Sequence, residues 1–142
     1  MALYTELPLY RDTYQLILKV YEITKEFSKE YKYTLGQDMK RDALQLMRSI
    51  YRANKHRNRV EHLEVFLDEL ELLKLEIRLC ADMKLVPMRK QAVLSELLER
   101  IGKQVPGWRM QPGKARITAV TVVVSEQVLF KSALGLLLYG VV

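Results

Sequence analysis

Apolar residues recur every three or four positions along most of the first 108 residues, which is the spacing of one face of an α-helix. Four segments with this pattern, residues 8–31, 36–54, 60–84 and 87–102, are separated by short stretches that contain glycine, proline or several charged residues. Short connections favour antiparallel neighbours. The pattern therefore predicts an all-α fold, an antiparallel up-down four-helix bundle over residues 1–108. The positions expected to point inward from the last three helices are Met39, Ala43, Leu46, Ile50 and Ala53; Leu63, Leu67, Leu70, Leu73, Ile77 and Cys80 or Ala81; and Val93, Leu94, Leu97, Leu98 and Ile101.

The first predicted helix carries two apolar rows instead of one. The first row is Tyr10, Tyr14, Ile17, Tyr21, Thr24, Ser28 and Tyr31, and the second is Leu16, Val20, Ile23 and Phe27. Two adjacent rows predict a helix that contacts more than one neighbour, so we expect the isolated protein to be an oligomer. The tyrosines could stack against nucleic-acid bases, but this spacing is more typical of a core or a subunit interface.

Residues 109–142 form a second predicted region, an apolar C-terminal extension that is rich in β-branched residues and poor in charge. Within it, "ITAVTVVV" is typical of a strand, whereas "VLFKSALGLLLYGVV" fits either a helix or a second strand. The longest uncharged run, residues 132–142, is too short to span a membrane. We expect a segment packed on the bundle or on a neighbouring subunit. A membrane-associated tail and a tail foreign to the domain are the alternatives.

The composition is that of an ordinary globular protein with a basic excess. The chain has 142 residues, of which 49% are hydrophobic and 28% charged, with a net charge of +6 and a pI of about 9.4. A basic excess of this size is compatible with a polyanionic partner. The single cysteine, Cys80, suits a reducing cytoplasm, and the acidic N-terminus "MALYTELPLYRD" lacks the apolar run of a signal peptide.

No pattern in the sequence indicates catalysis, a metal or a cofactor. A di-iron bundle needs Glu-x-x-His on two helices, but Ala53 and Arg59 stand three residues before His56 and His62. The sequence also lacks HExxH, paired cysteines, a phosphate-binding glycine loop and GxSxG. The acids of residues 60–84 are interpreted as a solvated or ion-paired helix face. We therefore do not expect an enzyme.

The most distinctive feature is a block of positive charge where the second predicted helix ends. Its candidate nucleic-acid-binding or partner-binding residues are Arg41, Arg48, Arg52, Lys55, Arg57 and Arg59, followed by a helix dominated by acids. Two interpretations compete. In the first, the cations pair with the acids of the next helix, each surface pair contributing about 0–1 kcal/mol. In the second, they bind phosphates with steep salt dependence. The turn residues Lys55, Arg57 and Arg59 favour the second interpretation slightly.

Several segments together resemble a known family. "YTLGQDMKRDALQLMRSIYRANK", then "LEIRLCADMKLVP", then "ERIGKQVPGW" resemble the accessory variability protein (Avd) of diversity-generating retroelements, a four-helix-bundle family related to proteins encoded in ribosomal RNA intervening sequences. The resemblance spans about residues 8 to 108. The residues that carry it are Leu35, Gly36 and Gln37; Arg52, Ala53 and Asn54; Arg78 and Leu79; and Ile101, Gly102 and Trp108. The apolar residues after Trp108 depart from the family pattern, in which the chain ends soon after this tryptophan.

The resemblance implies a function as well as a fold. It implies a bacterial or phage-encoded cytoplasmic protein that assembles as a homopentamer, binds a reverse transcriptase and its template RNA or RNA/cDNA, and supports mutagenic cDNA synthesis without a catalytic site of its own. It adds Arg78 to the candidate contacts, although only Arg52 and Arg78 lie inside matched motifs. The alternative functions are a bundle scaffold of the intervening-sequence type without a reverse-transcriptase partner, and a bundle metalloenzyme.

Overall fold

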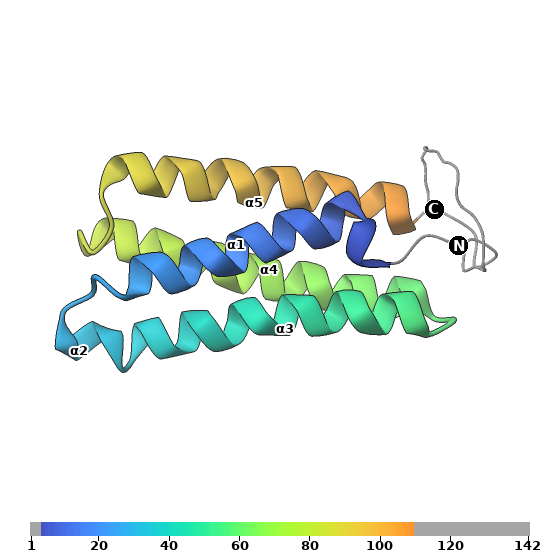
Figure 1. The fold of residues 1–142 in the computed structure, drawn as a ribbon, viewed down its shortest axis with the longest axis horizontal. Helices are drawn as coiled ribbons and strands as arrows, with labels where there is room; N and C mark the ends of the chain where they lie inside the picture. The colour runs from blue at the N-terminus through green and yellow to red at the C-terminus, as the bar shows by residue number, and fades with distance from the viewer. Residues whose placement is uncertain (1–3, 110–142) are drawn as a thin grey trace.

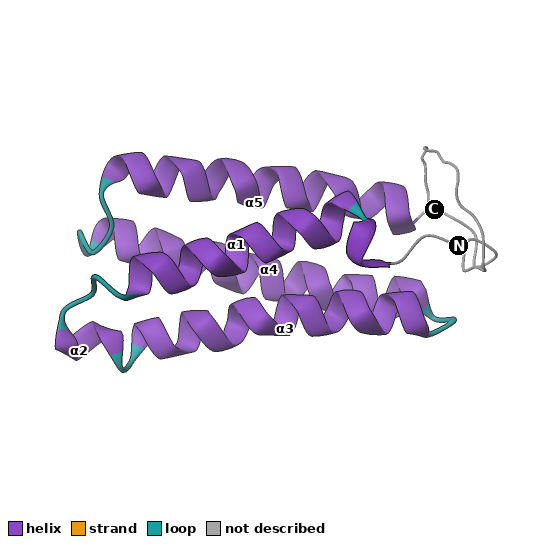
Figure 2. Cartoon of the chain, viewed as in Figure 1, coloured by secondary structure: helices purple, strands orange, loops and turns teal. Residues whose placement is uncertain are grey.

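The computed structural model describes residues 4–109, which form an antiparallel bundle of four long helices (Figure 1). In chain order the elements are the short 3₁₀ helix η1 (Tyr4–Glu6), α1 (Pro8–Thr24), the single turn α2 (Lys29–Lys32), α3 (Leu35–Lys55), α4 (Arg59–Asp82) and α5 (Met88–Arg109). Figure 2 shows that short loops join the long helices, so consecutive helices run in opposite directions. The predicted all-α bundle is confirmed, and the predicted C-terminal extension lies outside the described residues.

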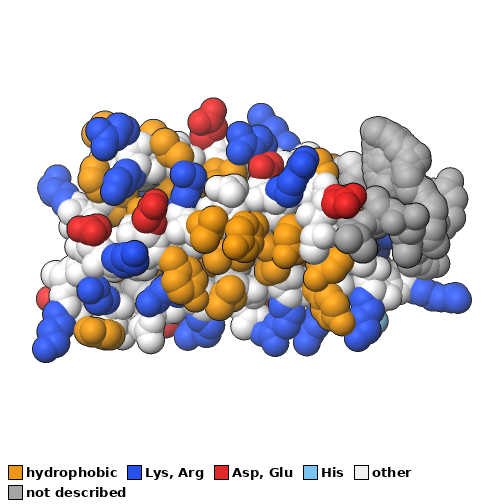
Figure 3. Space-filling view, in the orientation of Figure 1, with side chains coloured by type: hydrophobic (Ala, Val, Ile, Leu, Met, Phe, Trp, Pro, Cys, Tyr) orange, Lys and Arg blue, Asp and Glu red, His pale blue; other side chains and the backbone are white. Residues whose placement is uncertain are grey.

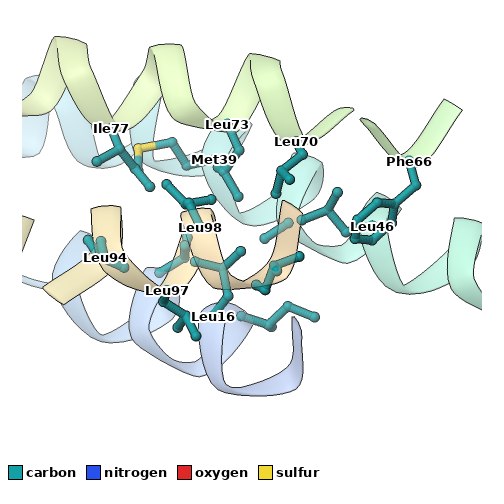
Figure 4. Packing of buried hydrophobic residues seen from close by; sticks show 14 of the residues in the cluster. Leu16, Met39, Leu46, Phe66, Leu70, Leu73, Ile77, Leu94, Leu97 and Leu98 are labelled. Carbon is teal, nitrogen blue, oxygen red and sulfur yellow. The ribbon is translucent and has the colours of Figure 1, made fainter. Parts of the chain in front are cut away.

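The core lies along the axis of the bundle and receives side chains from all four long helices (Figure 4). All five positions expected to point inward from α3 are buried, as are Leu63, Leu70, Leu73, Ile77 and Cys80 on α4. Phe66, which the pattern missed, is fully buried. Val93 was wrongly expected inside: it is 44% exposed, because the buried row on α5 begins one residue later, at Leu94.

The first predicted helix is wrong at its C-terminal end. Instead of continuing to residue 31, α1 ends at Thr24, whose hydroxyl donates to the carbonyl oxygens of Val20 at 2.9 Å and Tyr21 at 3.1 Å. The chain then turns so that Phe27 is buried at the end of the core. Gly36 permits this turn, since a Cβ there would lie 3.3 Å from the carbonyl oxygen of Tyr31 and 3.4 Å from the Phe27 ring.

The last predicted helix is longer than the pattern indicated. α5 continues past Gly102 to Arg109 and contains Pro106. A proline inside a helix removes one backbone hydrogen bond, here the one to the carbonyl of Gly102, and the exposed ring of Pro106 lies on the solvent side of the helix. Burial of Ile101, Val105 and Trp108, at successive steps of four and three, favours the extra turns.

The two apolar rows predicted for the first helix separate only in part, since Ile17 and Thr24 of the first row are buried together with the second row. Leu16, Val20, Ile23 and Phe27 are buried, whereas Tyr14 and Tyr21 are 49% and 40% exposed, so these two tyrosines do not belong to the core. Asp12 fixes α1 to α5 by accepting hydrogen bonds from Arg100 at 3.2 Å and Gln104 at 2.6 Å. No helix within residues 4–109 has the length and hydropathy needed to cross a lipid bilayer.

Candidate nucleic-acid interface

The basic block forms a tight turn between α3 and α4, at the end of the bundle where α1 begins and α5 ends (Figure 1). His56 leaves the helix in an extended conformation, with φ −96° and ψ 154°, and its N–H donates to the carbonyl of Arg52 at 2.9 Å. The N–H of Arg59 donates to the carbonyl of Arg57 at 2.8 Å, so three residues are enough to reverse the chain. Asn58 donates to the Glu61 carboxylate at 2.6 Å and steadies the start of α4. The turn is therefore held by its own hydrogen bonds.

Four cations at this end of α3 have no carboxylate partner within residues 4–109. Arg48, Arg52, Lys55 and Arg57 are exposed, and no salt bridge among the described residues includes them. Arg48 donates to the neutral side chain of Gln45, and the Lys55 ammonium lies 5.4 Å from the centre of the Tyr51 ring. Figure 3 shows Lys and Arg side chains along α3 toward the turn. These four residues are called the basic turn below.

Pairing between the cations of α3 and the acids of α4 is not observed. The salt bridges within the described part of the chain lie inside α3, inside α4, between α4 and α5, or between α1 and α5. The Lys74 ammonium, for example, lies 3.1 Å from Glu71 and 3.9 Å from Glu99. Glu69 on α4 attracts Arg48 and Arg52 at longer range, but within residues 4–109 no cation of the basic turn forms a salt bridge with the neighbouring helix.

Two of the predicted contact residues lie far from the turn. Arg41 is fourteen residues before Lys55 on the same helix, which is about 21 Å at 1.5 Å per residue. Its guanidinium lies 3.2 Å from Asp38 and 3.4 Å from Asp42. Arg78 lies near the other end of α4 and pairs with Asp82 at 3.5 Å. These two arginines are exposed but already paired, unlike the basic turn.

Arg59 points into the protein, which the sequence did not indicate. It is the first residue of α4, it is only 5% exposed, and its guanidinium lies 5.1 Å from the centre of the Trp108 ring on α5. Such a cation–π contact stabilises a buried guanidinium by about 2 kcal/mol. Arg59 therefore connects the start of α4 to the end of α5, and we leave it out of the proposed interface.

Two histidines stack at the turn, an arrangement that sequence reasoning missed. The rings of His56 and His62 have centroids 4.8 Å apart and planes inclined by 27°. His56 is exposed and His62 is half-buried. The only sequence signal was their spacing of six residues, with His56 in the predicted turn and His62 near the start of the next predicted helix. No group of three or more metal-binding side chains is found within residues 4–109.

The contact between α3 and α4 also contains buried polar groups. Ser49 donates to Glu69 at 2.7 Å, and burial raises the pKa of Glu69 despite that hydrogen bond. Glu76 faces Asp42 across the two helices. Burial raises the pKa of Glu76 to about 8, helped by the hydrogen bond that its protonated carboxyl group donates to Asp42 and by the negative charge of Asp42. Within the described residues, the Oε1 atom of Glu76 has no hydrogen-bond partner. Because of the raised pKa of Glu76, the free energy of unfolding of the bundle should depend on pH.

The comparison with family models agrees with this architecture. A model described as bAvd-like matches residues 9–111, which is well over half of the chain. The chain belongs to the bAvd-like family. The resemblance to Avd is thereby confirmed, whereas a search of the curated proteins finds no match. In this bAvd-like chain, two of the motif residues have structural roles, since Gly36 allows the turn before α3 and Trp108 covers Arg59.

Proposed function

We propose that this bAvd-like protein is a non-catalytic accessory subunit of a reverse transcriptase in a diversity-generating retroelement, and that it holds template RNA or RNA/cDNA in the cytoplasm. The observation that carries the proposal is the basic turn, with Arg48, Arg52, Lys55 and Arg57 exposed and without a carboxylate partner in the described structure. Membership of the family supports the reverse-transcriptase partner.

The chemistry of the basic turn suits a phosphate backbone. Its cations sit on one helix end and a hydrogen-bonded three-residue turn, so little backbone entropy is lost when phosphates bind. Guanidinium groups can also donate two parallel hydrogen bonds to a phosphate. Contacts to phosphates carry no sequence information, so we expect binding with weak sequence preference and steep salt dependence.

We further propose that the chain assembles through two different exposed apolar faces. The α1–α3 face carries Tyr14, Leu18, Tyr21, Leu44 and Tyr51, and the α4 face carries Val65, Leu72, Leu75 and Leu79. Figure 3 shows hydrophobic side chains gathered between α1 and α3, with Lys and Arg around them. The α4 face is bordered by acids, among them Glu61, Glu64, Asp68 and Glu71.

The two faces are complementary in charge and both apolar, so one copy can dock its α4 face on the α1–α3 face of the next. A contact between two unlike faces generates a closed ring when the rotation between copies allows it. The resemblance to Avd indicates a ring of five. Such a homopentamer would present five basic turns, and multivalent contact with one RNA would raise the overall affinity.

A charge-reversal pair tests the nucleic-acid interface. The variant Arg52→Glu with Arg57→Glu should bind a single-stranded RNA at least ten-fold more weakly than the native protein in fluorescence anisotropy, with an unchanged helical circular dichroism spectrum. The matched control is Lys29→Glu with Lys90→Glu, which makes the same charge change at exposed positions at the opposite end of the bundle. Equal loss of affinity in the two variants would show that net charge, and not the basic turn, drives binding.

Light scattering tests the assembly. The native protein should have an oligomeric mass at micromolar concentration, and Leu72→Asp with Leu79→Asp should give a monomer that keeps the helical spectrum. Both leucines are exposed, at 45% and 40%, so their replacement should not unfold the bundle. A native monomer would refute the proposed assembly.

The partner is tested by genomic context and co-purification. The proposal predicts a neighbouring reverse-transcriptase gene and two near-identical repeats that differ at adenines. It also predicts that this polymerase and its template RNA co-purify with the protein. A gene without such a neighbour would instead support the scaffold of the intervening-sequence type.

A further inference from the structure

The stacked pair His56–His62 places an aromatic surface in the middle of the basic turn. His56 lies between Lys55 and Arg57 in sequence, and all three side chains are exposed. One face of the His56 ring is covered by His62, with ring centroids 4.8 Å apart. His62 belongs to the first turns of α4 and is half-buried, so it forms a fixed support beneath the outer ring.

The backbone holds the outer ring in place as well. The N–H of His56 donates to the carbonyl of Arg52 at 2.9 Å, and the extended conformation of His56 turns the chain out of α3. An aromatic ring that is fixed before binding loses little entropy when a flat ligand stacks on it. Stacking on aromatic side chains, histidine included, is the usual way in which proteins hold the unstacked bases of RNA.

We propose that His56, supported by His62, is a stacking site for one unpaired nucleobase, and that Lys55 and Arg57 hold the phosphates on either side of that base. This inference rests on the proposed nucleic-acid function and goes beyond it, because it assigns a preference for single-stranded RNA or cDNA. In a duplex each base already stacks on its neighbours in the helix, so the site would have nothing to receive.

Phosphate binding and base stacking can be separated by the choice of probe. Binding of a single-stranded RNA oligonucleotide is compared with binding of the same oligonucleotide with abasic residues at its central positions, by fluorescence anisotropy with the full chain. His56→Ala should weaken binding of the intact oligonucleotide about 5- to 100-fold, which corresponds to the loss of one stacked base. It should leave binding of the abasic oligonucleotide unchanged.

Two further variants complete the test. His56→Tyr keeps an aromatic ring and should retain affinity for the intact oligonucleotide within about three-fold of the native value. Arg57→Ala removes only a phosphate contact and should weaken binding of both oligonucleotides equally. His56 is exposed, so the folding of its variants is checked simply by their circular dichroism and thermal midpoint.

The two ways of failing are distinct. Native protein that binds intact and abasic oligonucleotides with equal affinity would overturn the stacking site and leave the proposed function standing. Native protein that binds neither would overturn both. Loss of affinity in His56→Tyr as large as in His56→Ala would also overturn the inference, because stacking requires only an aromatic face.

Discussion

The carboxyl pair of Asp42 and Glu76 should make the stability of the bundle depend on pH. Burial raises the pKa of Glu76 from an ordinary value of 4.5 to about 8. A raised folded-state pKa means that the folded protein keeps a proton which the unfolded chain has already released. The contribution to stability is therefore fully present below pH 4.5 and is lost as pH rises toward 8.

The size of this effect follows from the shift. One pKa unit corresponds to 1.36 kcal/mol, so the full shift sets an upper limit of about 5 kcal/mol. The attraction of Arg41 is already included in that pKa, but solvent at the edge of the helix pair screens the interaction and lowers its contribution to stability. We therefore expect a loss of about 2 to 3 kcal/mol between pH 5 and pH 8 from this pair.

Glu76→Gln isolates the contribution. The glutamine amide is uncharged, has nearly the same shape and can donate a hydrogen bond to Asp42. It should raise the free energy of unfolding at pH 8 by about 2 kcal/mol, with little change at pH 5. Urea denaturation followed by circular dichroism at fixed protein concentration measures this, with the exposed Asp68→Asn on the same helix as the control. An equal effect of Glu76→Gln at both pH values would refute the reasoning.

Three further predictions concern the scaffold. Arg59→Ala should lower the free energy of unfolding by about 2 kcal/mol, because the cation–π contact with Trp108 is lost. The folded variant should keep its RNA affinity within about two-fold. A loss of affinity as large as that of Arg57→Ala would contradict the structural role of Arg59. At Gly107 an added Cβ would have nothing within 4 Å, so Gly107→Ala should raise the free energy of unfolding by about 0.5 to 1 kcal/mol and raise the thermal midpoint. At Gly36 an added Cβ would lie close to the Tyr31 carbonyl, so Gly36→Ala should lower the thermal midpoint or leave it unchanged. Cys80 is buried, and burial raises the pKa of its thiol to about 11. A thiol reagent should therefore modify Cys80 only after denaturant is added. Fast labelling of the native protein would show instead that this part of the core opens.

The sequence predicted most of the bundle because its central helices are strongly periodic. The ranges expected for α3 and α4 agree with the structure to within two residues at each end. The end of α1 was not predictable, since its position depends on the packing of Phe27 and on the contact between Gly36 and Tyr31, which are tertiary features. Likewise α5 continues through two glycines and a proline because Val105 and Trp108 are buried against other helices, which local propensity does not record.

The site was predictable in position but not in detail. A run of cations near a helix end is visible in the sequence, and the structure places four of them together at one turn. The inward direction of Arg59 depends on Trp108, which is 49 residues away in the chain. The stacking of His56 on His62 depends on the tight geometry of the turn between them. Both features require the fold to be known.

The salt dependence of RNA binding tests the central claim most directly. The affinity of the native protein for a single-stranded RNA is measured from about 50 to about 300 mM salt, where each phosphate contact on a single strand contributes about 0.7 to the slope of log K against log salt concentration. Four engaged cations per subunit predict a slope of about −3 or steeper, reduced by about 1.4 in Arg52→Ala with Arg57→Ala. A slope near zero, or a slope that this variant leaves unchanged, would contradict the assignment of the basic turn as the nucleic-acid interface.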